Sequence, residues 1–186
     1  SASISGASLT DPSFSTIWDA IDRLEMPVLV HPGAPPGVAE MDMERFNLVF
    51  SVGFMFDTTL AVARMIFDGF FDRYKKLNII ACHAGGALPY LVGRFDTAFE
   101  KMPPCREIIS ERPSSYYSRL YFDSISYTQG ALELCLNVAG KDKLLYGSDY
   151  PHNVGDMEGC LSRVEALSSN VQDAVKGGNA IRLFGL

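Results

Sequence analysis

Four short apolar runs recur along the chain, and none of them alternates with polar residues. They occupy residues 27–31, 78–83, 120–123 and 144–149. Runs of this kind are typical of strands that are buried on both faces, as in a parallel sheet. Segments with apolar residues at helical spacing precede and separate them, so the order is one helix and then strand–helix four times. This alternation predicts a parallel sheet with right-handed crossovers, either a small doubly wound sheet or half of an eight-stranded barrel.

The predicted helices begin and end at recognisable signals. The first begins at Thr10-Asp11-Pro12, where a capping side chain precedes a proline, and ends before Met26-Pro27. Further helices are expected at residues 57–67, 87–101, 129–138, 156–167 and 171–176. The segment Pro32–Phe56 is too long for a routine connection, so we expect it to border a pocket or an interface.

Composition narrows the class of protein. The chain has 186 residues, 47% of them hydrophobic and 20% charged, which suits one folded domain over residues 1–186. A net charge of -6 with scattered basic residues disfavours a nucleic-acid partner. We see no apolar stretch near the roughly 18 residues that span a bilayer, and no signal peptide, so we expect no membrane partner. Four widely spaced cysteines without a CxxC pair indicate reduced thiols, and we expect a cytoplasmic protein.

Each apolar run ends in a residue that can do chemistry, namely His31, His83, Asp123 and Asp149. Because parallel strands present their carboxyl ends at one edge, where a (β/α) barrel places its active site, these side chains should converge. Histidine and carboxylate groups suit zinc and similar metals, and an uncoordinated imidazole beside a metal can move a proton. Singly each residue is weak evidence. A lone histidine at a strand end is more often structural, Asp149 could cap a turn, and Asp123 is better suited to ordering a loop.

Longer motifs make the chain resemble a known family. They are His31-Pro-Gly, the segment 83–96 that opens with His-Ala-Gly-Gly, and the segment 145–152 that contains Gly-Ser-Asp-Tyr-Pro-His. Residues 58–64 and 178–186 add to the likeness, which covers nearly the whole chain. Together these motifs resemble the second amidohydrolase family, the group related to aminocarboxymuconate-semialdehyde decarboxylase.

The resemblance implies an α/β fold of the (β/α)8 TIM-barrel type, of which this chain is about the carboxyl-terminal half: four parallel strands with flanking helices. It implies one divalent metal, often zinc, held by His31 and Asp149. It gives His83 the catalytic role of acid and base, with Asp149 beside it as metal-binding catalytic residue. His152 is expected at the pocket mouth as a substrate contact. Trp18 and the stretch Phe46–Phe56 could touch an aromatic substrate, although core packing or a dimer contact is the favoured interpretation.

One departure from the family pattern changes the expectation for this chain. The family opens with a strand that carries His-x-His or Glu-x-His, which supplies two more metal ligands. This chain has only three histidines and no such motif. Catalytic zinc generally uses three protein ligands, and only two are matched here, so we expect little or no metal and no activity in the isolated chain. Bare strand edges would also need a partner, either a second copy or a complementary amino-terminal half.

In a complete barrel, the resemblance favours metal-dependent, non-oxidative decarboxylation of a small aromatic or unsaturated carboxylic acid. Hydrolysis of a lactone, ester or amide on the same site is an alternative. A second alternative is a non-catalytic half-barrel that acts only in a complex.

Overall fold

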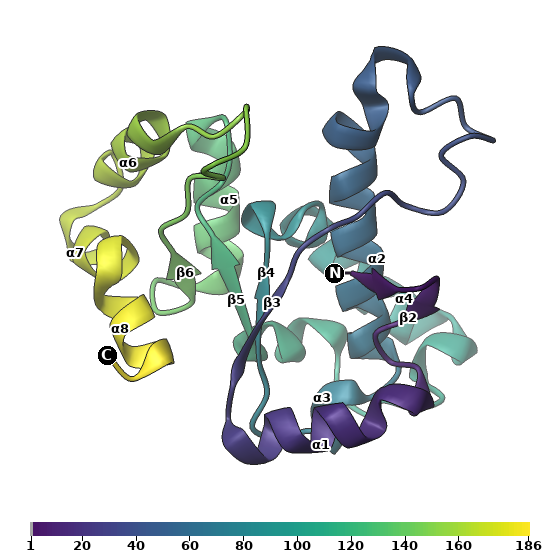
Figure 1. Ribbon diagram of the computed structural model, residues 1–186. Helices are drawn as coiled ribbons and strands as arrows, with labels where there is room; N and C mark the ends of the chain where they lie inside the picture. Colours follow the sequence, from purple (N-terminus) through teal and green to yellow (C-terminus); the bar gives the residue numbers. More distant parts are fainter. Residues whose placement is uncertain (1) are drawn as a thin grey trace.

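The computed structural model describes residues 2–186, and its centre is a four-stranded parallel sheet (Figure 1). The strands lie in the order of the sequence: β3 (Pro27–Val30), β4 (Asn78–Ala81), β5 (Leu120–Asp123) and β6 (Leu144–Leu145). A doubly wound sheet reverses its strand order at a switch point, whereas the strands of a (β/α) barrel follow one another around it. The observed order therefore decides for the half-barrel, and the predicted fold class is confirmed.

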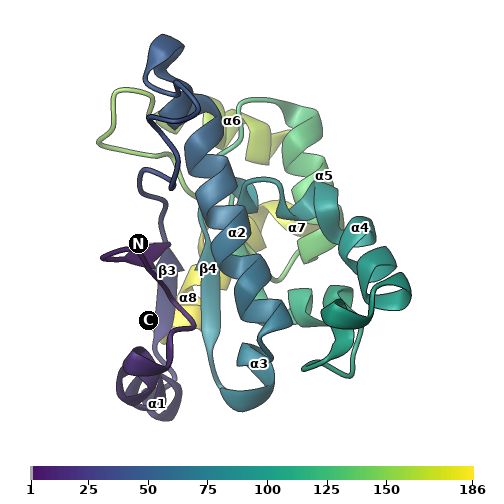
Figure 2. The ribbon, with the colours of Figure 1, turned by 90° about the vertical axis from the view of Figure 1, so that its right-hand side faces the viewer.

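Helices surround this sheet unevenly. The helices α2, α4 and α5 lie along one side of the sheet, whereas α6, α7 and α8 gather beyond β6 (Figures 1 and 2). The α-helices in the described part of the chain are α1 (Ser15–Leu24), α2 (Phe54–Phe67), α3 (Phe70–Arg73), α4 (Leu88–Lys101), α5 (Gln129–Ala139), α6 (Met157–Glu165), α7 (Ser169–Asp173) and α8 (Asn179–Phe184). A two-stranded antiparallel hairpin, β1 (Ser3–Ile4) and β2 (Ala7–Ser8), precedes them and was not predicted.

The core forms between the sheet and the helices on its covered side. Val62 and Met65 of α2, Leu132 of α5 and Ile79 of β4 are fully buried in one apolar cluster. Trp18 belongs to the same cluster: its ring meets the ring of Phe70 edge to face, and its indole N–H donates to the carbonyl of Leu9 at 2.8 Å. Trp18 is therefore a core residue, as the favoured interpretation held.

The long segment after β3 is more helical than its sequence predicts. A 3-10 turn (Arg45–Asn47) and a π-helical turn (Val49–Gly53) lead straight into α2, which begins at Phe54 and not at residue 57 or 58. Asp57 does not cap the helix, because its carboxylate accepts a hydrogen bond from the backbone N–H of Gly33 at 2.9 Å. We call residues 38–53 the projecting arm; it projects beyond the sheet in Figure 1, and Phe46 on it is 78% exposed.

The helical stretch Arg45–Phe67 is long and apolar enough to cross a membrane by length and composition alone, with a mean hydropathy of 1.5. This corrects the expectation that no stretch approaches that length. The core helix of a globular domain meets the same criterion, and α2 buries Val62, Met65 and Ile66 against the sheet. We therefore interpret its second part, Phe54–Phe67, as a core helix.

The two edges of the sheet differ, although both were expected to be bare. At β3 the side chain of Leu29 is 54% exposed. At β6 the carboxyl-terminal helices cover the edge: the N–H of Tyr146 donates to the carbonyl of Val175 at 2.9 Å, and the side chain of Asn179 donates to the carbonyl of Leu144 at 2.6 Å. Only the β3 edge fits the predicted need for a partner.

Two further expectations concern the length of the fourth strand and the state of the cysteines. The strand predicted at residues 144–149 ends at Leu145, because the chain turns away before Asp149, whose φ of 60° is incompatible with a strand. The four cysteines are free, and three of them are buried, which matches the expected reduced thiols.

Candidate metal centre and active site

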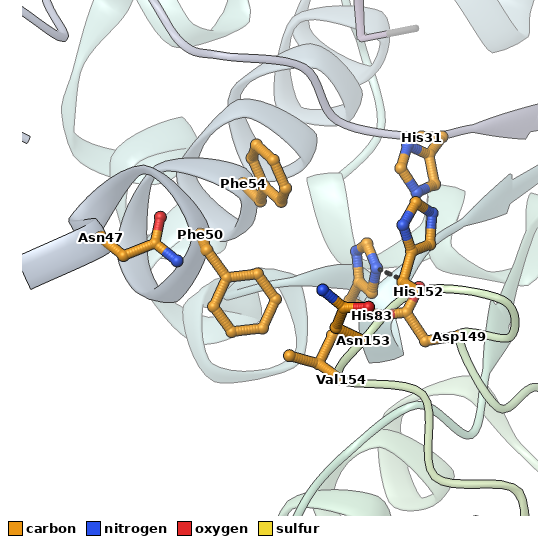
Figure 3. A pocket seen from close by; sticks show the side chains of 9 residues that line it. All are labelled: His31, Asn47, Phe50, Phe54, His83, Asp149, His152, Asn153 and Val154. Atoms are coloured by element: carbon orange, nitrogen blue, oxygen red, sulfur yellow. Dashed lines mark ion pairs between the residues drawn. The ribbon is translucent and has the colours of Figure 1, made fainter. Parts of the chain in front are cut away.

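Three predicted site residues meet at the carboxyl ends of the strands. His31 directly follows β3, His83 lies in the turn after β4, and Asp149 lies in the loop after β6 (Figure 3). The ring centroids of His31 and His83 are 5.3 Å apart, and Nε2 of His83 lies 3.6 Å from Oδ1 of Asp149. The convergence that parallel strands predict is present in the structure.

The turn that carries His83 is unusual in its backbone. His83 and Ala84 have φ angles of 56° and 50°, in the left-handed region that residues with a Cβ rarely adopt. The next two glycines have no room for a side chain: a Cβ on Gly85 would lie 2.5 Å from the ring of Phe122, and one on Gly86 would lie 2.6 Å from the carbonyl oxygen of Met55. Such strain concentrates at functional sites, and this turn carries the His83 imidazole that lines the cavity.

The side chain of Asp123 holds this turn in place through hydrogen bonds. Its buried carboxylate accepts hydrogen bonds from the backbone N–H groups of His83 and Ala84, both at 2.9 Å, and from that of Ile125 at 3.0 Å. Burial raises the pKa of Asp123 to about 6, against the lowering effect of the three hydrogen bonds. Asp123 thus orders the loop, as its position at the end of a strand suggested.

The electrostatic setting of His83 favours a neutral imidazole. Burial lowers the pKa of His83, and the neighbouring His31 acts in the same direction, while Asp149 opposes both. Within residues 2–186 its Nδ1 atom is buried without a hydrogen-bond partner. A neutral imidazole beside a carboxylate can accept a proton and be stabilised once charged, which is what an acid–base residue needs.

His152 lies close to the two predicted metal ligands. One possible ligand atom from each of His31, Asp149 and His152 lies within 4.8 Å of the other two. The His152 ring lies nearly parallel to that of His31, with centroids 6.1 Å apart and 19° between planes. Nδ1 of His31 lies 3.0 Å from the carbonyl oxygen of Pro32, which can only accept, so Nδ1 carries the hydrogen and Nε2 is free to bind.

This donor set fits a divalent cation. Two imidazoles and one carboxylate give the three protein ligands that catalytic zinc generally uses, and the same set also suits iron and manganese. From the family motifs only His31 and Asp149 are expected as ligands, and His152 is expected at the pocket mouth as a substrate contact. The sequence feature that could have placed His152 beside Asp149 is their short spacing, because a tight turn can bring two such residues together.

A cavity of about 240 Å³ opens onto these residues. Its walls are His31, Asn47, Phe50, Phe54, His83, Asp149, His152, Asn153 and Val154 (Figure 3). Phe50 and Phe54 face the imidazoles across it, so the segment after β3 borders a pocket, as predicted. The phenylalanine stretch was expected to pack in the core or at a dimer contact; instead Phe50 and Phe54 line the cavity, while Phe46 on the projecting arm is exposed to solvent.

A second cavity, of about 370 Å³, lies beside His83, with Tyr90 and Tyr127 among its walls. Phe50 and Phe54 line both cavities. The surroundings of the His83 imidazole are therefore rich in aromatic side chains.

Fold and site together define half of a (β/α) barrel with a candidate metal centre at the carboxyl ends of its strands. The family model described as "Amidohydrolase" matches residues 3–186, and the chain belongs to this family, in the group related to aminocarboxymuconate-semialdehyde decarboxylase.

Named relatives agree with this assignment. The chain is 29% identical over 188 residues to 2-amino-3-carboxymuconate-6-semialdehyde decarboxylase of Dictyostelium discoideum, which covers 100% of this chain and 52% of the relative. It is 30% identical over 184 residues to gamma-resorcylate decarboxylase of a Rhizobium species, covering 94% and 55%. The chain thus spans about half the length of the curated relatives it matches.

A solved structure shows the same fold. The dihydroxybenzoic acid decarboxylase of a Polaromonas species, crystallised with bound manganese and the inhibitor 2-nitroresorcinol, superposes with a TM-score of 0.85 at 23% identity. The match covers 97% of this chain and 56% of that one.

Proposed function

We propose that this chain forms the carboxyl-terminal half of a metal-dependent barrel that removes carbon dioxide, without oxidation, from a small aromatic or unsaturated carboxylic acid. The observation that carries the proposal is the meeting of His31, His83 and Asp149 beside an aromatic-lined cavity. Relatives named as decarboxylases of such acids support it.

The residues divide the work by chemistry. His31 and Asp149 would hold the cation, which when bound would orient and polarise the oxygen atoms of the acid. Phe50 and Phe54 would pack on the flat face of the substrate. His83, after taking up a proton from solvent, would deliver it to the carbon that bears the carboxylate; the carbon–carbon bond then breaks, its electron pair returns to the substrate, and carbon dioxide leaves. Asp149, 3.6 Å from Nε2, would stabilise the imidazolium between proton uptake and delivery.

We propose zinc as the cation, because imidazole and carboxylate groups are among its usual catalytic ligands. Manganese is the competing candidate, since it is the metal bound in the Polaromonas relative. A chelated protein reloaded with each metal in turn distinguishes them by the rate that each restores.

We also propose that the chain works only in an assembly. The exposed β3 edge at Leu29 and the exposed Phe46 on the projecting arm are surfaces that a partner would cover, either a complementary amino-terminal half or a second copy. Light scattering at micromolar concentration should find a dimer or larger assembly. A stable monomer would contradict this part of the proposal. The free cysteines are consistent with a cytoplasmic protein, which we propose as its location.

The test of the function supplies a complementary amino-terminal half in trans and measures loss of a dihydroxybenzoic acid together with release of carbon dioxide. We expect turnover only with both halves and a metal. His83→Ala should abolish turnover and leave metal bound, whereas Asp149→Ala should lose both, since the two side chains are assigned to different steps.

Glu158→Gln is the matched control, because Glu158 is an exposed residue on α6 outside the cavity. It should leave turnover unchanged. Hydrolysis of an ester or lactone without release of carbon dioxide would overturn decarboxylation in favour of hydrolysis. Metal loss in His83→Ala would overturn the division of roles.

A further inference from the structure

We propose that His152 is a metal ligand, and that His31, Asp149 and His152 together make a three-donor cation site contained within this chain. The inference deepens the proposed function, because it concerns the same metal centre. It differs from the expectation that this half holds only two ligands and little metal.

The three candidate ligand atoms lie within 4.8 Å of one another. Bonds of about 2.0–2.2 Å to a common zinc ion place ligand atoms roughly 3–4 Å apart, so the side chains need only close slightly on a cation. His152 is exposed and lies in a loop, so its side chain can make that adjustment without disturbing the core.

The loop itself brings His152 to this point. The backbone N–H of His152 donates to the carbonyl of Asp149 at 2.9 Å, and the N–H of Gly155 donates to the carbonyl of His152 at 2.8 Å. The loop is closed by a third bond, from the N–H of Asp156 to the carbonyl of Ser148 at 2.9 Å. These bonds hold the side chains of Asp149 and His152 on the same side of one tight turn, facing His31 (Figure 3).

The neighbouring residues Asp123 and His83 have other roles and are not assigned as metal ligands. The carboxylate of Asp123 is taken up by three backbone N–H groups, so it is not available as a ligand. The His83 imidazole is largely buried, lies 3.6 Å from Asp149 through its Nε2 atom, and lines the cavity, where it is assigned to proton transfer. His152 is therefore the side chain of this chain that can complete the donor set of His31 and Asp149.

The experiment titrates zinc into the metal-free 186-residue chain by calorimetry, and follows cobalt by its visible absorption, which reports the ligands bound directly to the ion. The unaltered chain should bind one equivalent. His152→Ala should weaken zinc binding at least tenfold and change the cobalt spectrum, while Glu158→Gln should change neither. Circular dichroism of each variant checks the fold, and the exposure of His152 predicts an unchanged spectrum for His152→Ala.

Two results would overturn the proposal: no stoichiometric metal in the unaltered chain, or equal affinity and an identical cobalt spectrum in His152→Ala. Because the readout is metal binding, it is separable from the proposed function. Metal bound through His152 without release of carbon dioxide by the reconstituted enzyme would contradict decarboxylation alone. Release of carbon dioxide with unaltered metal binding in His152→Ala would contradict this inference alone.

Discussion

The turns after β4 and β6 both place a site residue, His83 or Asp149, in the left-handed region of the backbone, yet they are held differently. The turn at His83 is mostly buried. Its backbone N–H groups donate hydrogen bonds to the Asp123 carboxylate, and its glycines pack against Phe122 and Met55. The turn at Asp149 is closed mainly by its own backbone hydrogen bonds and is exposed over much of its length. The proton-transfer residue thus stands on a rigid support, whereas two of the candidate metal ligands stand on a loop that can adjust to an ion.

The largest effect is expected from Gly86→Ala in the buried turn. The added Cβ would lie 2.6 Å from the carbonyl oxygen of Met55 and 2.8 Å from Oγ1 of Thr59, at a φ of +62°. We expect the free energy of unfolding to fall by about 3 kcal/mol or more, from combined steric clash and backbone strain. Urea denaturation measures this loss.

Gly130→Ala is the matched control for this substitution. Gly130 lies in the helix α5, and a Cβ there meets nothing within 4 Å. It should be neutral or should stabilise the protein by up to about 1 kcal/mol, through helix propensity. Equal losses in Gly86→Ala and Gly130→Ala would show that the buried turn is not the rigid element described above.

The second prediction concerns how the free energy of unfolding depends on pH through Asp123, which holds the turn of His83. The folded pKa of Asp123 is about 6, above the roughly 3.9 of an unfolded aspartate, so the folded state holds its proton more tightly. The contribution of protonated Asp123 to the free energy of unfolding is therefore fully present below about pH 4, and it is lost as the pH rises through about 6. We expect Asp123 to contribute about 2–3 kcal/mol to the fall in unfolding free energy over this window.

The measurement compares urea denaturation of the unaltered chain and of Asp123→Asn at several pH values. The amide has no titrating group but keeps one oxygen as an acceptor. Its unfolding free energy should therefore fall less between pH 4 and 6 than that of the unaltered chain. If the unfolding free energies of the two proteins changed in parallel with pH, Asp123 would titrate normally and the turn at His83 would be less rigid than its burial implies.

The smallest effect is expected from Gly155→Ala in the exposed turn. A Cβ there would lie 3.0 Å from the carbonyl oxygens of both Asp149 and His152. Because this loop is exposed and can shift by a few tenths of an ångström, the loss of unfolding free energy should stay at about 1 kcal/mol or less. The same shift moves the candidate ligands, so zinc affinity should fall measurably by calorimetry. A stability loss as large as that of Gly86→Ala would erase the contrast between the two turns.

The sequence alone determined the elements and the chemistry at their ends. Four unalternated apolar runs predicted the parallel strands, and His31, His83 and Asp149 at their ends predicted a convergent site, because the direction of parallel strands dictates where their ends meet. The motifs around His83 and Asp149 identified the family, and the loop-ordering role expected of Asp123 matches its three hydrogen bonds.

Tertiary structure decided what depends on contacts between distant segments. Hydrophobic periodicity is a local signal, so it left open whether the strands follow one another or reverse; only the pairing of β3, β4, β5 and β6 in sequence order settled the half-barrel. Local pattern could not show that Asp57 bonds Gly33 and leaves α2 to start at Phe54. Nor could it place His152 beside His31, because that distance is set by the left-handed turn at Asp149 together with the register of two strands at opposite edges of the sheet.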